Sequence, residues 1–436
     1  MQRLNDDLWR GELGFSVALD LASRFVLIKK ESGARVYRSW FFNDEPKLFS
    51  YNVDLNGLIK KPRDSDDGVG SGTALTPKVA LMKAMGESIE RYCLCLYGEK
   101  KFTNASYKAV KHEAIDIFKL RNFSAEQLKR KEFKNYRYDE QSKMNWVEGF
   151  SLRDGKNILI PAQLVYVPYK FGNEVCIRDP ITTGAAASTS LGGAVYRGMC
   201  EIIERDAFMI TYLNKLSRES IDLNCHKELK KMKKMCERYN LELKVIDIST
   251  DLGVAAMMGV IVDRTGIGPA VSFGLSADLD PMIAAIGAAK ESFHGRPWIR
   301  SEMMKQVQGK SLNDLVNRGI YWSDPKMIKK CQFLFENDKN KVLIQKYKSR
   351  YKPNKLKKML LIFTELFNYD VYFVEVTTPE IRKYGFRVVK VIIPDLHPLY
   401  LDDVHPYWES KRLFEVPKKM GLGGSSILNK IPHPFL

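Results

Sequence analysis

Residues 183–210, TGAAASTSLGGAVYRGMCEIIERDAFMI, do most to decide the fold. A turn-like run of Gly, Ala, Ser and Thr leads into a helical stretch that is apolar on most of its circumference. That stretch also carries Glu201, Glu204 and Arg205. Because a helix that is apolar nearly all round is usually buried, we expect an interior helix that holds three charged side chains.

Two other segments share this design. Residues 70–94, GSGTALTPKVALMKAMGESIERYCL, place a Gly-rich turn before a helix, with Thr76 as N-cap and Pro77 at the first helical position. Residues 272–300, SFGLSADLDPMIAAIGAAKESFHGRPWIR, start a third helix at Asp280 and Pro281. ESIER and EIIER are the same motif, so the sequence contains an internal echo.

Strand-like runs lie between the helices. They are residues 146–152, 157–167, 243–248, 257–263, 269–274, 369–376 and 387–396, the first two pairing around Gly155. Strands mixed with helices predict an α/β (α+β) class. Helical insertions are expected at about 107–141 and 302–360. Because no Pro/Gly/Ser linker divides the chain, we predict one domain over residues 1–436.

Composition excludes several classes of protein. The 436 residues carry a formal charge of +17 and 45% hydrophobic residues, which is typical of a globular chain. No apolar run is long enough to cross a bilayer, and no signal peptide is visible. Seven cysteines without a C-x-x-C pair predict neither a disulfide framework nor a zinc knuckle, and favour a reducing cytoplasm.

Much of the positive charge lies in residues 339–358, KNKVLIQKYKSRYKPNKLKK. A solvated basic face is the favoured interpretation. A patch for nucleic acid or an acidic peptide is the alternative.

The paired motifs predict a cation site. In each motif the two glutamates and the arginine share one helix face. A lone motif of this kind is typically a surface ion pair, but these two have apolar flanks. Two arginines cannot neutralise Glu87, Glu90, Glu201 and Glu204, and Glu291 of the third segment adds to the deficit. Mg²⁺ prefers oxygen ligands and usually arrives with substrate phosphates, so these residues suggest a nucleotide–Mg²⁺ site. Neither a Walker A loop nor a G-x-G-x-x-G motif occurs.

These segments resemble the YcaO family, in particular its azoline-forming members. The resemblance runs from about residue 68 to the end, with core blocks at about 68–300 and 369–436. It rests on GTALTPKVALMKAMGESIERY, WVEGFSL…IPAQLVY, TGAAAS…EIIERDAF, RPWIR and the PHPFL tail. It implies a fold of mixed sheets with buried helices that hold ATP and Mg²⁺. The implied metal residues are Glu87, Glu90, Glu201, Glu204 and Glu291, and the nucleotide residues further include Gly72, Thr73, Arg91, Arg205 and Arg296.

Three positions depart from the family pattern. Lys83 stands where Ser is common, Arg197 where a side-chain amide is common, and His294 where Gln is common. Lys83 and Arg197 are expected to contact phosphates or to replace part of a metal's role, so the number of Mg²⁺ ions stays open.

The tail, Pro432 to Leu436, has Leu where the azoline-forming members usually end in Pro. A free terminus is the ordinary fate of last residues, but the resemblance favours a tail inserted near the active site.

The resemblance implies an ATP-dependent cyclodehydratase that acts on a ribosomal precursor peptide. A Cys, Ser or Thr side chain attacks the preceding amide, whose oxygen is phosphorylated, and loss of phosphate leaves a thiazoline or oxazoline. His294 and the terminal carboxylate of Leu436 are the candidate general bases.

Alternatives and partners follow from the same resemblance. Peptide thioamidation, amidine formation and a non-catalytic scaffold or nucleic-acid binder remain open as functions. Expected partners are the precursor peptide, an E1-like protein that binds its leader, and a flavin-dependent dehydrogenase. The protein is expected to form a homodimer or a hetero-complex, without a membrane and without nucleic acid.

Overall fold

The structure is a computed structural model. It describes residues 35–38, 42–55, 69–97, 102–305, 315–335, 341–342, 354–423 and 427–435.

The strands form three sheets. β1, β2 and β3 make one antiparallel sheet, and the order in the second is β11-β10-β9-β8-β12. The third has the order β4-β5-β13-β14-β7, with β6 paired to β5. The strands are β1 (Arg35–Arg38), β2 (Phe49–Asp54), β3 (Val69–Ala74), β4 (Thr103–Ser106), β5 (Lys143–Ser151), β6 (Lys156–Pro161), β7 (Ala185–Ser188), β8 (Ser220–Ile221), β9 (Leu241–Asp247), β10 (Ala255–Asp263), β11 (Val271–Asp278), β12 (Lys341–Val342), β13 (Tyr372–Glu375) and β14 (Arg387–Ile392).

Helices of very different length connect these strands. They are α3 (Pro77–Cys95), α4 (Tyr107–Val110), α5 (Ala125–Lys129), α6 (Leu191–Leu213), α7 (Lys227–Glu237), α8 (Pro281–Glu291), α9 (Arg296–Met304), α10 (Leu315–Tyr321), α11 (Met327–Cys331), α12 (Lys355–Leu360), α13 (Pro379–Lys383) and α14 (Lys411–Lys419), with a π-helical turn, η8, at Leu361–Leu366. Short 3₁₀ turns are η2 (Ile117–Leu120), η3 (Lys131–Tyr136), η4 (Ala162–Leu164), η5 (Leu223–Cys225) and η6 (Gln332–Leu334).

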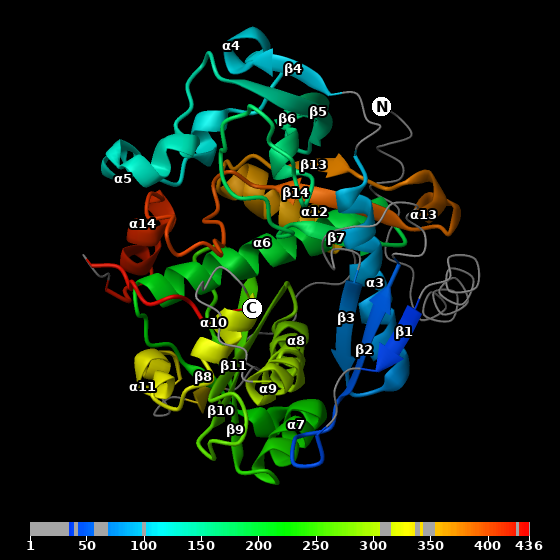
Figure 1. The fold of residues 1–436 in the computed structure, drawn as a ribbon, viewed down its shortest axis with the longest axis vertical. Helices are drawn as coiled ribbons and strands as arrows, with labels where there is room; N and C mark the ends of the chain where they lie inside the picture. Colours follow the sequence, from blue (N-terminus) through cyan, green and yellow to red (C-terminus); the bar gives the residue numbers. More distant parts are fainter. Residues whose placement is uncertain are drawn as a thin grey trace.

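α6 is the central helix. It contacts β7 and β14 of one sheet and β10 and β11 of another, so it lies between the two sheets (Figure 1). Nearly every residue of α6 is buried, as its apolar sequence predicts. The opposite face of β10 and β11 is covered by α8, and α3 packs on β2 and β3. Ser190 caps α6 by accepting a hydrogen bond from the Gly193 N–H at 3.1 Å, and Asp280 caps α8.

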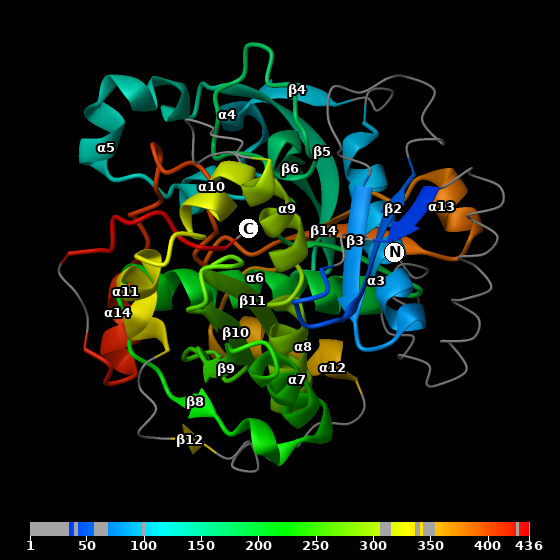
Figure 2. The same cartoon turned by 60° about the horizontal axis from the view of Figure 1, so that its bottom comes forward.

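The three small-residue segments are strands rather than turns. β3, β7 and β11 each lead directly into α3, α6 and α8. A Cβ atom on Gly70 would lie 2.1 Å from the Ser88 nitrogen, and one on Gly72 would lie 2.3 Å from the Ala80 oxygen. Gly70 and Gly72 therefore allow α3 to pack closely on β3, which corrects the prediction of a flexible turn. The acidic residues lie in the middle of α3 and α6 and at the C-terminal end of α8, and Figure 2 shows α3 and α8 beside the strands that precede them, β3 and β11.

The mixed α/β class is confirmed, and the predicted pairing of β5 with β6 is present. The first predicted insertion contains only short helical turns separated by loops. Most of the basic run at 339–358 lies outside the described residues. Within the described part of the chain, no helix has the length and apolar character that a bilayer span would need.

Candidate functional site

Five carboxylates from three helices act on one another. Glu87 and Glu90 come from α3, Glu201 and Glu204 from α6, and Glu291 from the end of α8. The negative charges of Glu87 and Glu201 raise the pKa of Glu90, and those of Glu291 and Glu201 raise the pKa of Glu204. The structure thus brings together all five residues of the predicted acidic set.

On α3, the two glutamates accept hydrogen bonds from different donors. Glu87 accepts hydrogen bonds from Arg91 Nη2 at 2.7 Å and from the Ser71 N–H at 2.9 Å. Glu90 accepts one from the Ala187 N–H of β7 at 2.8 Å. Burial is the main cause that raises the pKa of Glu90, to about 8.

On α6, one arginine forms ion pairs with two glutamates. Arg205 Nη1 lies 3.0 Å from Glu204 Oε1, and its Nη2 donates to Glu201 at 3.4 Å. Glu201 also accepts from the Gly184 N–H at 3.0 Å. Burial holds the pKa of Glu204 well above its usual range. Arg205 Nε and Nη1 have no hydrogen-bond partner in the described structure.

His294 follows α8 and joins it to β3. Its Nδ1 lies 2.7 Å from Thr73 Oγ1 and its Nε2 lies 2.8 Å from Ser71 Oγ. Thr73 donates its own proton to Ser50, and Ser71 Oγ donates to Glu87 Oε2 at 3.2 Å, so each ring nitrogen of His294 faces a hydroxyl group whose proton already has another acceptor. Burial lowers the pKa of His294, which disfavours the charged form of the ring. To act as a general base through Nε2, His294 would first have to break its contact with Ser71.

Lys83 and Arg197 lie at the exposed rim of the carboxylate cluster. Lys83 interacts electrostatically with Glu291, Glu87 and Arg197. In the described residues, no hydrogen bond or ion pair uses the side chain of Lys83 or Arg197. Both cations are therefore available to a negatively charged ligand.

Three predicted site residues are placed differently from the expectation. Gly72 and Thr73 belong to β3 rather than to a turn, and the Thr73 side chain is buried. Arg296 is 1% exposed, and its guanidinium bonds to Glu45 and Asp263 at 2.9 Å and to the Pro269 oxygen at 2.8 Å. Because these partners engage Arg296 away from the carboxylate cluster, its role here is to anchor α9. Leu436 lies outside the described residues.

The tail reaches the site from the other end of α6. Tyr212 and Trp322 donate hydrogen bonds to the Pro432 oxygen at 3.0 and 3.2 Å. Phe435 is buried, and its ring centre lies 4.0 Å from the Arg205 guanidinium. The tail therefore packs against a residue of the cluster, as the sequence predicted, and runs back along α6 (Figure 1).

The arrangement fits a nucleotide with Mg²⁺. Carboxylates that are partly or fully buried together favour a bound cation, while Lys83, Arg197 and the unpartnered Nε of Arg205 suit phosphate oxygens. Within the described part of the chain, no three His, Cys, Asp or Glu side chains are already placed to hold a metal ion. The five-carboxylate metal set is thus not preassembled, which agrees with the tendency of Mg²⁺ to bind together with phosphates.

Comparison with known proteins gives a consistent result. Residues 71–397 match the family model described as "YcaO cyclodehydratase, ATP-ad Mg2+-binding". ATP and Mg²⁺, the cofactors predicted from the sequence, are the ligands named in that description. An uncharacterised protein of Methanothermobacter thermautotrophicus is 25% identical over 279 residues, which are 61% of this chain and 68% of the relative.

Solved structures share the fold. A heterocyclase in complex with substrate and cofactor has a TM-score of 0.78 at 20% identity, over 94% of this chain and 57% of the heterocyclase. YcaO from Methanopyrus kandleri, bound with AMPPCP and Mg²⁺, has a TM-score of 0.65 at 16% identity, over 91% of this chain and 95% of that one. A chain of the E. coli microcin synthetase McbBCD complex has a TM-score of 0.56 at 14% identity, over 83% of this chain and 88% of that one. The present chain therefore spans little more than half the length of the first of these heterocyclases.

Proposed function

The chain belongs to the YcaO family, and we propose that it is an ATP-dependent cyclodehydratase that converts Cys, Ser or Thr of a ribosomal precursor peptide into thiazoline or oxazoline. The observation that supports this function best is the meeting of α3, α6 and α8, which supplies acidic oxygens for Mg²⁺ beside basic groups for phosphates. ATP would supply the phosphoryl group that the peptide amide oxygen accepts.

The protein's own residues position and neutralise charge. In this proposal Arg205 orients two of the glutamates that hold the cation, which are Glu87, Glu90, Glu201, Glu204 and Glu291. Lys83 and Arg197 bind the phosphates from the rim. Such positioning accounts for most of the catalysis in phosphoryl transfer, which needs no protein nucleophile.

The partners remain part of the proposal. A precursor peptide, a leader-binding protein and a dehydrogenase are expected, and the likeness to a chain of a synthetase complex supports assembly with other proteins. A cytoplasmic location fits a substrate made on ribosomes.

The test is reconstitution with a candidate precursor peptide, ATP and Mg²⁺. We expect release of phosphate only with peptide present, and a mass loss of one water per ring. Glu204→Gln and Glu87→Gln should abolish ring formation, whereas Glu113→Gln, on an exposed loop, should not. Full activity in both site variants would refute the proposed metal site.

Peptide thioamidation is the second candidate, and the state of His294 favours it. Both of its ring nitrogens are engaged with hydroxyl groups, so the described site offers no free histidine to take a proton from a substrate side chain. An external sulfur nucleophile that arrives deprotonated would need no such base. Exchange of one oxygen for sulfur in the product mass, instead of loss of water, would decide for thioamidation.

A further inference from the structure

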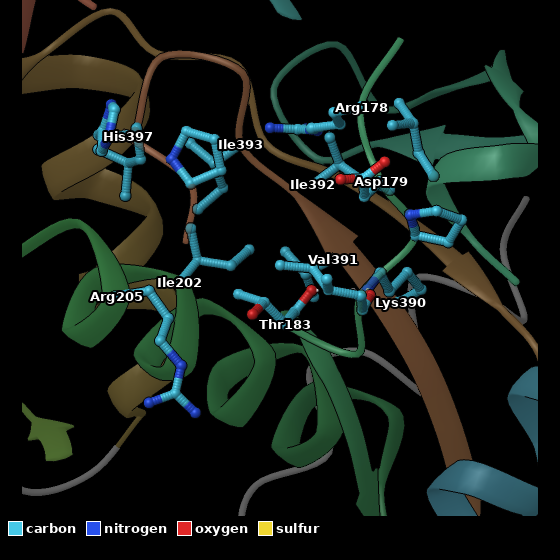
Figure 3. Close-up of a pocket in the computed structure, with 15 residues that line it drawn as sticks. Arg178, Asp179, Thr183, Ile202, Arg205, Lys390, Val391, Ile392, Ile393 and His397 are labelled. Atoms are coloured by element: carbon cyan, nitrogen blue, oxygen red, sulfur yellow. Dashed lines mark hydrogen bonds between the residues drawn. The ribbon is translucent and has the colours of Figure 1, made fainter. Parts of the chain in front are cut away.

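A small cavity lies beside α6, on the side of β14. It is bounded by α6, by β14 with the loop that follows it, and by the loop before β7 (Figure 3). Its volume is about 50 Å³. Arg205 lines it with its side-chain stem, while its guanidinium points away from Arg178 and His397 (Figure 3). The cavity therefore adjoins the carboxylate cluster without being part of it.

The cavity contains a cation without a counter-ion. Arg178 projects from the loop before β7 toward the side where His397 lies (Figure 3). No hydrogen bond or ion pair in the described residues uses its guanidinium, and burial lowers its pKa. Arg178 is partly buried, and a guanidinium that has lost part of its hydration without gaining a partner favours a bound anion.

Two more polar residues line the same cavity. His397 is fully buried, and neither ring nitrogen has a hydrogen-bond partner. Lys390, buried within β14, donates to the Thr183 oxygen at 2.7 Å and also to the Ile181 oxygen, which holds the wall of the cavity in place. Buried polar atoms in folded proteins nearly always have partners, so a ligand with acceptor atoms is expected here.

The nearby acids are committed to other residues. Asp179 lines the cavity, but it accepts the hydroxyl proton of Tyr136 at 2.8 Å. Asp206 is bonded to Arg412 at 2.7 Å and to the His397 N–H at 2.8 Å. Neither carboxylate neutralises Arg178.

The volume of the cavity limits the size of the ligand. A buried water needs about 10–15 Å³ of such volume, so 50 Å³ accommodates a group of about four or five heavy atoms. We propose that the cavity bounded by Arg178, His397 and Lys390 binds inorganic phosphate. This inference rests on the proposed function for the origin of the ligand: the phosphate released when the ring closes would appear next to Arg205, one side chain away from this cavity.

The experiment measures phosphate binding without peptide or turnover. Thermal unfolding is followed with increasing sodium phosphate against sodium chloride and sodium acetate at equal ionic strength, and the affinity is measured by calorimetry. A ligand that binds only the native state raises Tm. We expect phosphate to raise the Tm of the wild type, and Arg178→Met to weaken phosphate binding at least tenfold.

Arg264→Met is the matched control, since Arg264 is exposed and remote from the cavity lining. It removes the same charge and should leave phosphate binding unchanged. Without phosphate, Arg178→Met should be at least as stable as wild type, because it removes a partly buried cation that has no counter-ion. Should that variant fail to fold, His397→Phe serves instead, with an expected loss of affinity of several fold.

Saturation with AMPPCP and Mg²⁺ identifies where the phosphate binds. Binding that persists in the presence of the nucleotide and depends on Arg178 supports the cavity. Binding that disappears with the nucleotide, or is equal in wild type and Arg178→Met, overturns it, and so does a response to acetate without one to phosphate. An inactive protein that still binds phosphate through Arg178 would refute the proposed function while leaving this inference standing.

Discussion

ESIER in α3 and EIIER in α6 have the same spacing but different surroundings. The Arg91 and Glu87 side chains are 38% and 32% exposed, whereas the corresponding Arg205 and Glu201 are 11% and 25% exposed. α3 packs on β2 and β3 and also contacts β7 and β14, yet part of its surface stays exposed, whereas nearly every residue of α6 is buried between two sheets. The comparison teaches that the same residues form a solvated ion pair or a buried charge cluster according to what packs on the helix.

The largest expected difference concerns the two arginines. Arg205→Met leaves Glu201 and Glu204 without their cation, so the free energy of unfolding should fall by about 3–5 kcal/mol. Arg91→Met removes a half-exposed pair and should cost less than about 1 kcal/mol. Urea unfolding of both variants at pH 7.5 without nucleotide gives the two values. Equal losses would mean that the two motifs are energetically alike.

An intermediate effect is expected at Glu90. This residue belongs to the α3 motif, but burial raises its pKa, as it does for Glu204 of the α6 motif. Its pKa is about 8 in the folded protein, against an ordinary 4.5. Between these two pH values the native state binds more protons than the unfolded state. The stability of the native state with respect to Glu90 is therefore greatest below pH 4.5 and falls as the pH rises to 8.

Glutamine does not ionise, so Glu90→Gln should abolish this fall in stability. The variant should be more stable than the wild type by about 2 kcal/mol at pH 8 without nucleotide, allowing for partial solvation. At pH 4.5 it should have little effect. The measurement is the difference in unfolding free energy between wild type and variant across this pH range, and a difference that does not change with pH would contradict the prediction.

The smallest expected effect is at the tail. The Phe435 ring covers Arg205, and a partly buried cation–π contact contributes about 1 kcal/mol. Phe435→Leu combined with Arg205→Met in a double-mutant cycle should give a coupling energy of about that size. The same cycle with Arg91→Met should give none, because the ring contacts of Phe435 in the described residues are with Arg205 and Phe208 of α6. Coupling to Arg91 would show that the tail acts on the whole cluster.

The helices and their acidic residues were largely predictable, because the signals are local. Pro77 and Asp280 mark helix starts, and the spacing of each motif places its charges on one face. The Gly-rich strand before α3 was read as a turn because the need for glycine there comes from the helix packed above it. That contact joins residues about 8 to 18 positions apart in the chain.

At the site, contacts between residues that are far apart in the sequence limited what could be predicted. Arg296 was assigned to the nucleotide from its motif, but Glu45, 251 positions away, engages its guanidinium. Burial all round was predicted for both motif helices, yet Val79 of α3 is 44% exposed. Nothing local in the sequence distinguishes α3 from α6 in this respect, since the covering sheets are assembled from distant segments.

The position of α6 between two sheets also bears on hydrogen exchange. A helix enclosed on both faces cannot unfold locally without separating the sheets around it. Its backbone amides should therefore be among the last in the molecule to take up deuterium, at rates set by global unfolding, while those of α3 exchange earlier. The two glutamates of α6 would then keep their positions for as long as the native protein persists, while the two on α3 would move away and return as that helix opens and closes.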